Sequence, residues 1–205
     1  LIENIVKNNL EKEIQIEKIL SLKILDPAMG SGHFLIGAVE YVATRLCEIE
    51  FGEVSELDYI ERKRDVVRRC IYGVDINPLS VDLARLSLWL ETLSSDKPLS
   101  FLSAHLKTGN SLIGTELQSI FEKQTTLFES EKGRSAFKKN VKTFLMFEGL
   151  EDDSNTAIKM KIEEYEKMQS KGTIYYDLKF LLDCKIGENF GIKIPNLGDY
   201  RAKIG

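Results

Sequence analysis

Cysteine, proline and histidine are scarce in this sequence of 205 residues, which holds three, four and two of them. The cysteines, Cys47, Cys70 and Cys184, are odd in number and widely spaced, and no Cys-x-x-Cys pair occurs. Neither a disulfide framework nor a zinc knuckle is therefore indicated, and we expect no metal site. A reduced, cytoplasmic compartment suits this use of cysteine.

Long apolar runs and an excess of positive charge are missing as well. The longest apolar stretches, such as residues 34–39, are far too short to span a bilayer, and no secretory leader opens the chain. The net charge is −4, whereas a small autonomous nucleic-acid-binding domain is usually basic. Contact with nucleic acid must then come from motifs or from a longer parent protein. A parent is expected, since the chain opens at Leu1 inside an amphipathic pattern and ends at Gly205 without a clear terminal element.

What the sequence does contain is enough for a folded α/β domain. Hydrophobic residues make up 43% and charged residues 29%, which excludes a disordered chain. Apolar periodicity predicts helices over residues 1–20, 34–50, 56–69 and 77–93, and strands over 22–25, 71–76 and 102–107. Strand, helix, strand, helix, strand predicts a parallel sheet with right-handed crossovers.

After Gly114 the strand signal fades and the pattern becomes helical. We expect helices over residues 117–128, 135–147, 156–169 and 175–182. A doubly wound sheet usually has five or more strands, with its ligand cleft beside the first. With three strands, the first becomes an exposed edge unless the helical region covers it.

The main chemical signal is the string Leu-Asp-Pro-Ala-Met-Gly-Ser-Gly-His-Phe at residues 25–34. A glycine-rich turn between strand and helix lets a ligand approach the backbone. The dinucleotide fingerprint fails, because Leu35 stands where its third glycine belongs, and no Gly-Lys-Ser/Thr of a P-loop follows. S-adenosylmethionine remains, and Asp26 can bind its cationic amino group directly or through water.

Two further strings follow the second and third strands. In Tyr-Gly-Val-Asp-Ile-Asn-Pro at residues 72–78, Asp75 can accept both ribose hydroxyls of an adenosine, and Ile76 can pack on the adenine. The alternative for Asp75 is an acid that complements the dipole of the following helix, which Asn77 caps. In residues 106–112, Asn110 can pair with the amino edge of adenine, although an ordinary polar loop is the alternative.

Together the three strings resemble the adenine-specific DNA methyltransferases of type IIG restriction–modification and phage-exclusion systems. The resemblance covers residues 1–114, with 115–205 as a helical insertion or extension. It implies a partial doubly wound, Rossmann-like, S-adenosylmethionine-dependent methyltransferase domain. The cofactor residues it implies are Asp26, Ala28, Gly30, Gly32, Phe34, Asp75, Ile76 and Asn110. Asn110 stands where the family has Asp, so that contact differs in detail.

The family's catalytic tetrapeptide, Asn/Asp-Pro-Pro-Tyr/Phe, is absent. Asn77-Pro78-Leu79-Ser80 shares only its first two residues and is interpreted as a helix cap. The aromatic residue of the tetrapeptide would stack on a flipped base, so this chain has no site for the target adenine. We therefore predict no catalytic residue here, an inactive isolated chain, and DNA contact only through other parts of the parent.

The remaining residues favour ordinary roles. His33 packs beside the cofactor loop, His105 caps or fills a strand end, and Trp89 belongs to the core. The basic residues of 62–69 indicate a solvated helix face, and those of 132–142 form only a weak basic patch. The alternative functions are an RNA or protein methyltransferase and a non-catalytic module that binds S-adenosylmethionine. The sequence leaves the oligomeric state open.

Overall fold

The computed structural model describes residues 2–51, 55–94, 97–115, 135, 138–139, 141–143, 150 and 152–192, with side chains of the first helix from Leu10 onward. The contacts divide the chain into two compact units. One is Leu1–Ser111 with Glu148–Met160, and the other is Leu112–Phe147 with Lys161–Gly205. The predicted boundary at residue 114 stays a prediction.

The predicted helices of the first 93 residues are all confirmed to within two residues. The helices are α1 (Ile2–Leu20), α2 (His33–Glu50), α3 (Glu56–Arg69), α4 (Pro78–Glu91), α8 (Asn155–Gln169) and α9 (Ile174–Asn189). The strands are β1 (Ile24–Asp26), β2 (Ile71–Asp75) and β3 (Leu106–Thr108).

Three of these helices begin at side chains that accept a hydrogen bond from the first turn. Ser55 accepts from the amide of Asp58 before α3, and Thr173 accepts from Tyr176 before α9. Asn77 accepts from Leu79 at the start of α4, with Pro78 as the first helical residue. The interpretation of Asn77-Pro78 as a helix cap is confirmed.

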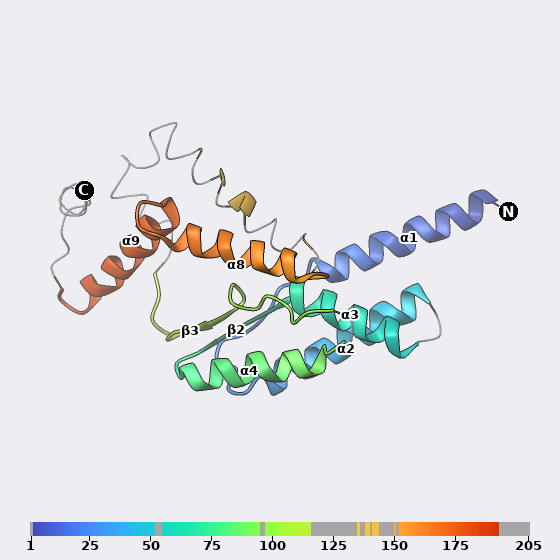
Figure 1. Cartoon of the computed structure of the whole chain (residues 1–205), viewed down its shortest axis with the longest axis horizontal. Helices are drawn as coiled ribbons and strands as arrows, with labels where there is room; N and C mark the ends of the chain where they lie inside the picture. The colour runs from blue at the N-terminus through green and yellow to red at the C-terminus, as the bar shows by residue number, and fades with distance from the viewer. Residues whose placement is uncertain are drawn as a thin grey trace. The chain divides into compact units, whose positions relative to one another are not determined.

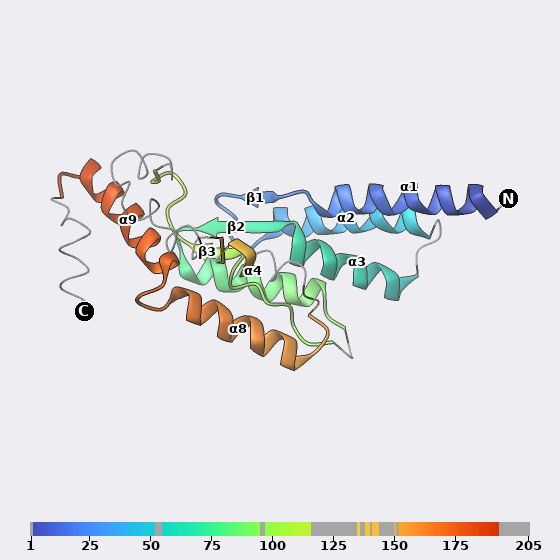
Figure 2. The same ribbon diagram turned by 90° about the horizontal axis from the view of Figure 1, so that it is seen from above.

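The three strands form one parallel sheet in the order β1-β2-β3 (Figures 1 and 2). In register, Asp26 lies opposite Gly73, and Asp75 lies opposite Thr108. Strand β1 is an edge of this sheet, and Leu25 within it is 57% exposed. The parallel sheet and the exposed first strand are confirmed. The wider, doubly wound arrangement stays a prediction.

The third strand was predicted four residues too early. Residues 102–105 form a turn instead, in which the amides of His105 and Leu106 both donate to the carbonyl of Leu102. The apolar signal of Phe101 and Leu102 is real, because both side chains are buried. A short apolar run fits a buried turn as well as a strand, so periodicity alone misplaced the strand.

The helical region after residue 115 is described only in part. Helix α8 confirms the prediction over 156–169, and α9 extends seven residues beyond the predicted end at 182, to Asn189. Residues 135, 138–139 and 141–143 are helical, within the helix predicted over 135–147. The helix predicted over 117–128 lies outside the described residues.

The core of the first unit lies between the sheet and helices α2 and α4, with α3 packed against α2. Figure 1 shows α4 along one face of the strands. A side chain added at Gly73 would collide with the sulfur of Met29 and come within 3.1 Å of Leu35 and Leu106. Glycine at this position of β2 therefore allows the glycine-rich loop to lie directly on the sheet.

Aromatic rings gather at the start of β2 and just before β3. The rings of Tyr72 and His105 stack with centroids 4.6 Å apart, and Nζ of Lys23 lies 5.5 Å from the Tyr72 centroid. His105 is buried, and its Nδ1 lies 2.8 Å from the carbonyl oxygen of Ile71. Trp89 packs against the core and donates to the carbonyl of Ser100 at 2.9 Å. The expected roles of His105, which fills a strand end, and of Trp89, which belongs to the core, are confirmed.

Lys107 in β3 makes stability depend on pH. Burial, and secondly the positive charge of Arg85, lower its pKa from about 10.5 to about 8. Between these values the unfolded chain holds a proton that the folded chain has lost, so this group makes the folded state more stable as pH rises. We expect the unfolding free energy of wild type minus that of Lys107→Met to increase between pH 8 and 10.

Urea unfolding at pH 7.5, 9 and 10 measures this difference. Burial raises the pKa of Cys47, Cys184 and Tyr175. These groups make the folded state less stable as pH rises, which is opposite to the effect of Lys107. Because both proteins contain them, the difference isolates Lys107. A difference that stays constant across the three pH values would contradict the assignment.

Candidate functional site

The predicted site residues gather at the carboxyl edge of the sheet. Asp26 ends β1 and Asp75 ends β2, while Asn110 comes two residues after the end of β3. Parallel strands bring these three ends to one edge, which is where α/β sheets bind ligands. The three sequence strings thus contribute neighbouring loops.

The loop after β1 is a compact turn held to the sheet by backbone hydrogen bonds. Oδ1 of Asp26 accepts from the amide of Ala28 at 3.0 Å, and the amide of Met29 donates to the carbonyl of Val74 at 3.0 Å. Gly30 and Gly32 have φ angles of 55° and 86°, a left-handed region that favours glycine. Among the described residues, Oδ2 of Asp26 has no protein donor. That oxygen can accept from a cationic ligand.

Asp75 joins the three loops. Its Oδ2 accepts from the amide of Gly30 at 2.9 Å, and its Oδ1 accepts from the amide of Asn77 at 2.8 Å. Its carbonyl accepts from the amide of Gly109 at 2.9 Å. Each carboxylate oxygen has a second lone pair, so both can still accept a hydrogen bond from a ligand hydroxyl. The two interpretations of Asp75, an acid that complements the dipole of the following helix and a ligand-binding acid, are therefore compatible.

Gly30 and Gly32 have different roles in the loop. A side chain at Gly30 would meet no atom within 4 Å, so this face of the loop is open. A side chain at Gly32 would lie 3.2 Å from the Cβ of Ala84. Gly32 is needed for the close approach of α2 and α4, whereas Gly30 leaves its backbone accessible to a ligand.

Gly32→Ala is expected to destabilise the fold by about 1–3 kcal/mol, because alanine at a left-handed φ is strained and its methyl group crowds Ala84. The matched control is Gly37→Ala within α2, where the added methyl meets nothing within 4 Å. That change should stabilise the protein by about 0.5–1 kcal/mol. Urea denaturation measures the free energy of unfolding of both variants, which should change in opposite directions. Equal changes would contradict the role of Gly32 in the packing of α2 against α4.

Apolar side chains flank the polar loops. Phe34 in the first turn of α2 is 63% exposed, and Ile76 directly after β2 is 70% exposed. Large apolar side chains with this much exposure beside polar loops can cover a flat ring. Ala28 is exposed too, whereas the neighbouring Met29 is buried against Gly73. The role of Met29 could not be predicted, because nothing in the string distinguishes a side chain that lies under the loop from one on its surface.

The described residues fit a ligand with hydroxyl donors, an aromatic ring and a positive charge. Asp75 offers acceptors for hydroxyls, Asp26 offers one to a cation, and Ile76 offers an apolar surface. His33 is exposed at the start of α2, with its Nδ1 3.0 Å from Oγ of Ser31. Within the described ranges, no three His, Cys, Asp or Glu residues gather to hold a metal ion, and no helix could cross a membrane.

The prediction of a solvated basic face on α3 is wrong for Lys63 and Arg64, which are both buried. Lys63 pairs with Glu91 of α4 and lies 4.4 Å from the Tyr59 ring centroid. Within the described part of the chain, the donors of Arg64 all point to backbone carbonyls. These cations therefore hold the fold together. The basic stretch of 132–142 lies largely outside the described residues.

The parallel sheet with its glycine-rich loop and strand-end carboxylates has the arrangement of a partial methyltransferase fold. The family described as the DNA-methyltransferase domain of MmeI matches residues 2–125, more than half of the sequence. The chain belongs to this family, and the resemblance drawn from the three strings is confirmed.

Three curated proteins are similar to the chain. A putative type II restriction enzyme and methyltransferase of Methanocaldococcus jannaschii, RM.MjaORFECS2P, is 32% identical over 108 residues, 48% of this chain and 9% of that protein. The adenine-specific methyltransferase PglX of Streptomyces coelicolor is 33% identical over 109 residues, 49% of this chain and 9% of its own length. The type II restriction enzyme and methyltransferase RM.Eco57I of Escherichia coli is 31% identical over 132 residues, 55% of this chain and 13% of its own.

The chain thus spans about a tenth of the length of these relatives. No solved structure matches it.

Proposed function

We propose that this chain is the S-adenosylmethionine-binding part of a site-specific adenine DNA methyltransferase in a restriction–modification or phage-defence system. The observation that carries the proposal is the Asp75 carboxylate, which joins the glycine-rich loop to the ends of the strands. Membership in a DNA-methyltransferase family supports a methyl donor as the ligand. Two of the similar proteins are named as type II restriction enzymes, which supports DNA as the substrate of the whole enzyme.

In this proposal, each loop binds one part of the cofactor. Asp75 accepts the ribose hydroxyls while it keeps its hydrogen bonds to the backbone. Ile76 packs on the adenine, and Asn110 contacts its amino edge. Asp26 binds the amino group of the methionine part through the oxygen that the turn leaves open.

The glycine-rich loop supplies backbone and shape. Ala28 and Gly30 face the cofactor, Gly32 sets the turn into α2, and Phe34 covers the bound molecule. The cofactor supplies a methyl group on a positively charged sulfur, so the transfer depends on placement and electrostatics. None of these residues needs to act as a chemical base.

The target adenine would be held by other parts of the methyltransferase. The chain lacks the Asn-Pro-Pro-Tyr type of tetrapeptide. Strand β1 is the exposed edge of the sheet, next to the predicted ligand loop. A further strand pairing with β1 would complete a doubly wound sheet and bring the missing residues beside the cofactor. DNA is therefore proposed as a partner of the whole protein.

Calorimetric titration of the purified chain with S-adenosylmethionine tests the proposal, with NAD as the control ligand. We expect saturable binding of S-adenosylmethionine and no binding of NAD. Incubation with DNA and S-adenosylmethionine labelled in its methyl group should transfer no label, because the target-base site is missing. Binding of NAD alone would contradict the cofactor, and transferred label would contradict the proposed division of the enzyme.

A second candidate is a module that binds S-adenosylmethionine without catalysis, which the missing tetrapeptide favours for this chain. Methylation of adenine by the full-length protein, together with its loss in an Asp75 variant, would decide for the enzyme. An RNA or protein methyltransferase would instead label RNA or protein in the same assay.

A further inference from the structure

Helix α4 has two apolar faces, and the sheet uses only one of them. Val81, Ala84 and Leu88 are buried in the core. On the opposite side lie Leu79, Leu83, Leu86 and Leu90, which are 64%, 45%, 50% and 64% exposed. At 100° per residue, these four leucines fall within about 60° of one another and diametrically opposite the buried three. A helix that is apolar on both sides is normally covered on both.

The exposed leucines have the spacing of a helix-pairing seam. They follow one another at intervals of four, three and four residues. Leu93, 56% exposed, lies two residues beyond the end of the helix and continues this apolar surface. We call Leu79, Leu83, Leu86, Leu90 and Leu93 the leucine stripe. Alternation of three and four is the pattern by which one helix inserts side chains between those of another. Scattered surface leucines need no such regularity.

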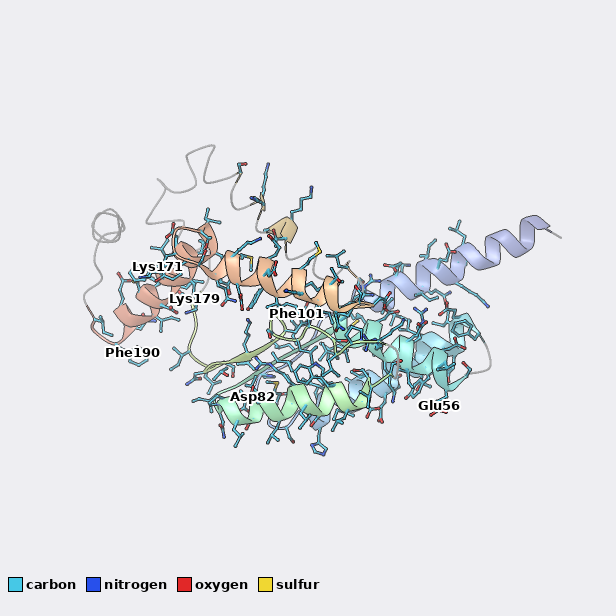
Figure 3. The ribbon with its side chains drawn as sticks, in the orientation of Figure 1. Glu56, Asp82, Phe101, Lys171, Lys179 and Phe190 are labelled. Atoms are coloured by element: carbon cyan, nitrogen blue, oxygen red, sulfur yellow. The ribbon has the colours of Figure 1, made fainter. Side chains whose placement is uncertain are left out.

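The residues beside the stripe suit a second helix of the same sequence. One flank carries the small residues Ser80 and Ser87, which allow close approach. The other flank carries Asp82 and Trp89, and Asp82 marks this helix in Figure 3. When two copies pair in opposite directions, the serine flanks face each other and Asp82 faces Trp89. No two like charges meet along the seam.

We propose that the leucine stripe is the interface of a homodimer, in which α4 pairs antiparallel with α4 of a second copy. Two stripes would bury on the order of 1,000 Å² in total, the lower end of the range for specific interfaces. A contact at this end of the range is typical of weak, reversible association, so dimerisation should depend on protein concentration. The interface uses none of the proposed cofactor residues, although Leu79 lies in the turn that follows Ile76 and Asn77. It does not depend on the proposed function.

Sedimentation equilibrium of this chain from 5 to 300 μM tests the proposal. The weight-average mass should rise with concentration from 23.3 kDa toward twice that value. The double variant Leu83→Glu/Leu86→Glu should stay monomeric over the whole range. Both leucines point away from the core, so the circular dichroism spectrum and the unfolding midpoint should stay near those of wild type.

The matched control is Leu57→Glu, which changes a leucine that is 75% exposed on α3. This variant should dimerise like wild type. A wild-type chain that remains monomeric at 300 μM would overturn the proposal and leave the stripe to a different protein segment. Dimers that persist in the double glutamate variant would overturn it as well.

Cysteine cross-linking tests the direction of the pair. Antiparallel helices with a two-fold axis between Leu83 and Leu86 place position 83 of one copy opposite position 86 of the other. In a Cys184→Ser background, an equal mixture of Leu83→Cys and Leu86→Cys chains should form the mixed disulfide well above the 2:1:1 ratio, mixed to each symmetric one, that random pairing gives. Preference for the symmetric disulfides would indicate parallel pairing and overturn the proposed interface.

Discussion

Asp75→Ala is expected to weaken the binding of S-adenosylmethionine more than 100-fold, or about 2.7 kcal/mol. The substitution removes the acceptors of two ribose hydroxyls. It also leaves the amides of Gly30 and Asn77 without their hydrogen-bond acceptor, so the glycine-rich loop and the start of α4 lose their common anchor. The loss of affinity therefore has two sources, one in direct contact and one in the positioning of the loop.

Calorimetry on three variants separates these sources. Asp75→Asn keeps one acceptor oxygen and the volume of the side chain, so its affinity should lie between those of wild type and Asp75→Ala. The matched control is Asp82→Ala, an exposed acid of α4 whose partner is Arg85, and its affinity should equal that of wild type. Unchanged affinity in Asp75→Ala would remove Asp75 from the cofactor site.

The loops at the carboxyl edge were predictable because their chemistry is local. A few neighbouring residues are enough to recognise a glycine that must take a left-handed φ, an acid that ends a strand, or an Asn-Pro that starts a helix. The parallel order of the strands follows from alternation with helices. What each string could not reveal was their connection, since the hydrogen bond from Gly30 to Asp75 spans 45 residues.

The residues whose burial or exposure was not predicted are those whose surroundings come from distant parts of the chain. Periodicity correctly predicts α4 but cannot show that its leucines divide into a buried face and the leucine stripe. The burial of Arg64 could not be predicted for a similar reason. Its charged pattern is that of a surface helix, and its partners are backbone carbonyls up to 88 residues away. Sequence patterns record side-chain polarity and carry no signal of such partners.

Arg64→Met is expected to cost about 3 kcal/mol of unfolding free energy. The guanidinium is buried and donates to the carbonyls of Thr92, Pro98 and Asp152 at 3.3, 2.8 and 2.8 Å. Methionine preserves the apolar stem and leaves these oxygens without their donor.

The damage from Arg64→Met should concentrate where α3 meets the segments around residues 97 and 152. Lys97 reinforces that place by pairing with Glu61 at 2.6 Å and Asp153 at 3.3 Å. Arg64→Lys should recover little of the loss, because a single ammonium group cannot reach three carbonyls that a planar guanidinium spans. The matched control is Arg45→Met, whose exposed guanidinium pairs with Glu48 on the same helix, so its loss should leave the free energy of unfolding nearly unchanged. Urea unfolding of the three variants provides the measurement. Full recovery by lysine would show that the positive charge, and not the set of hydrogen bonds, holds this junction together.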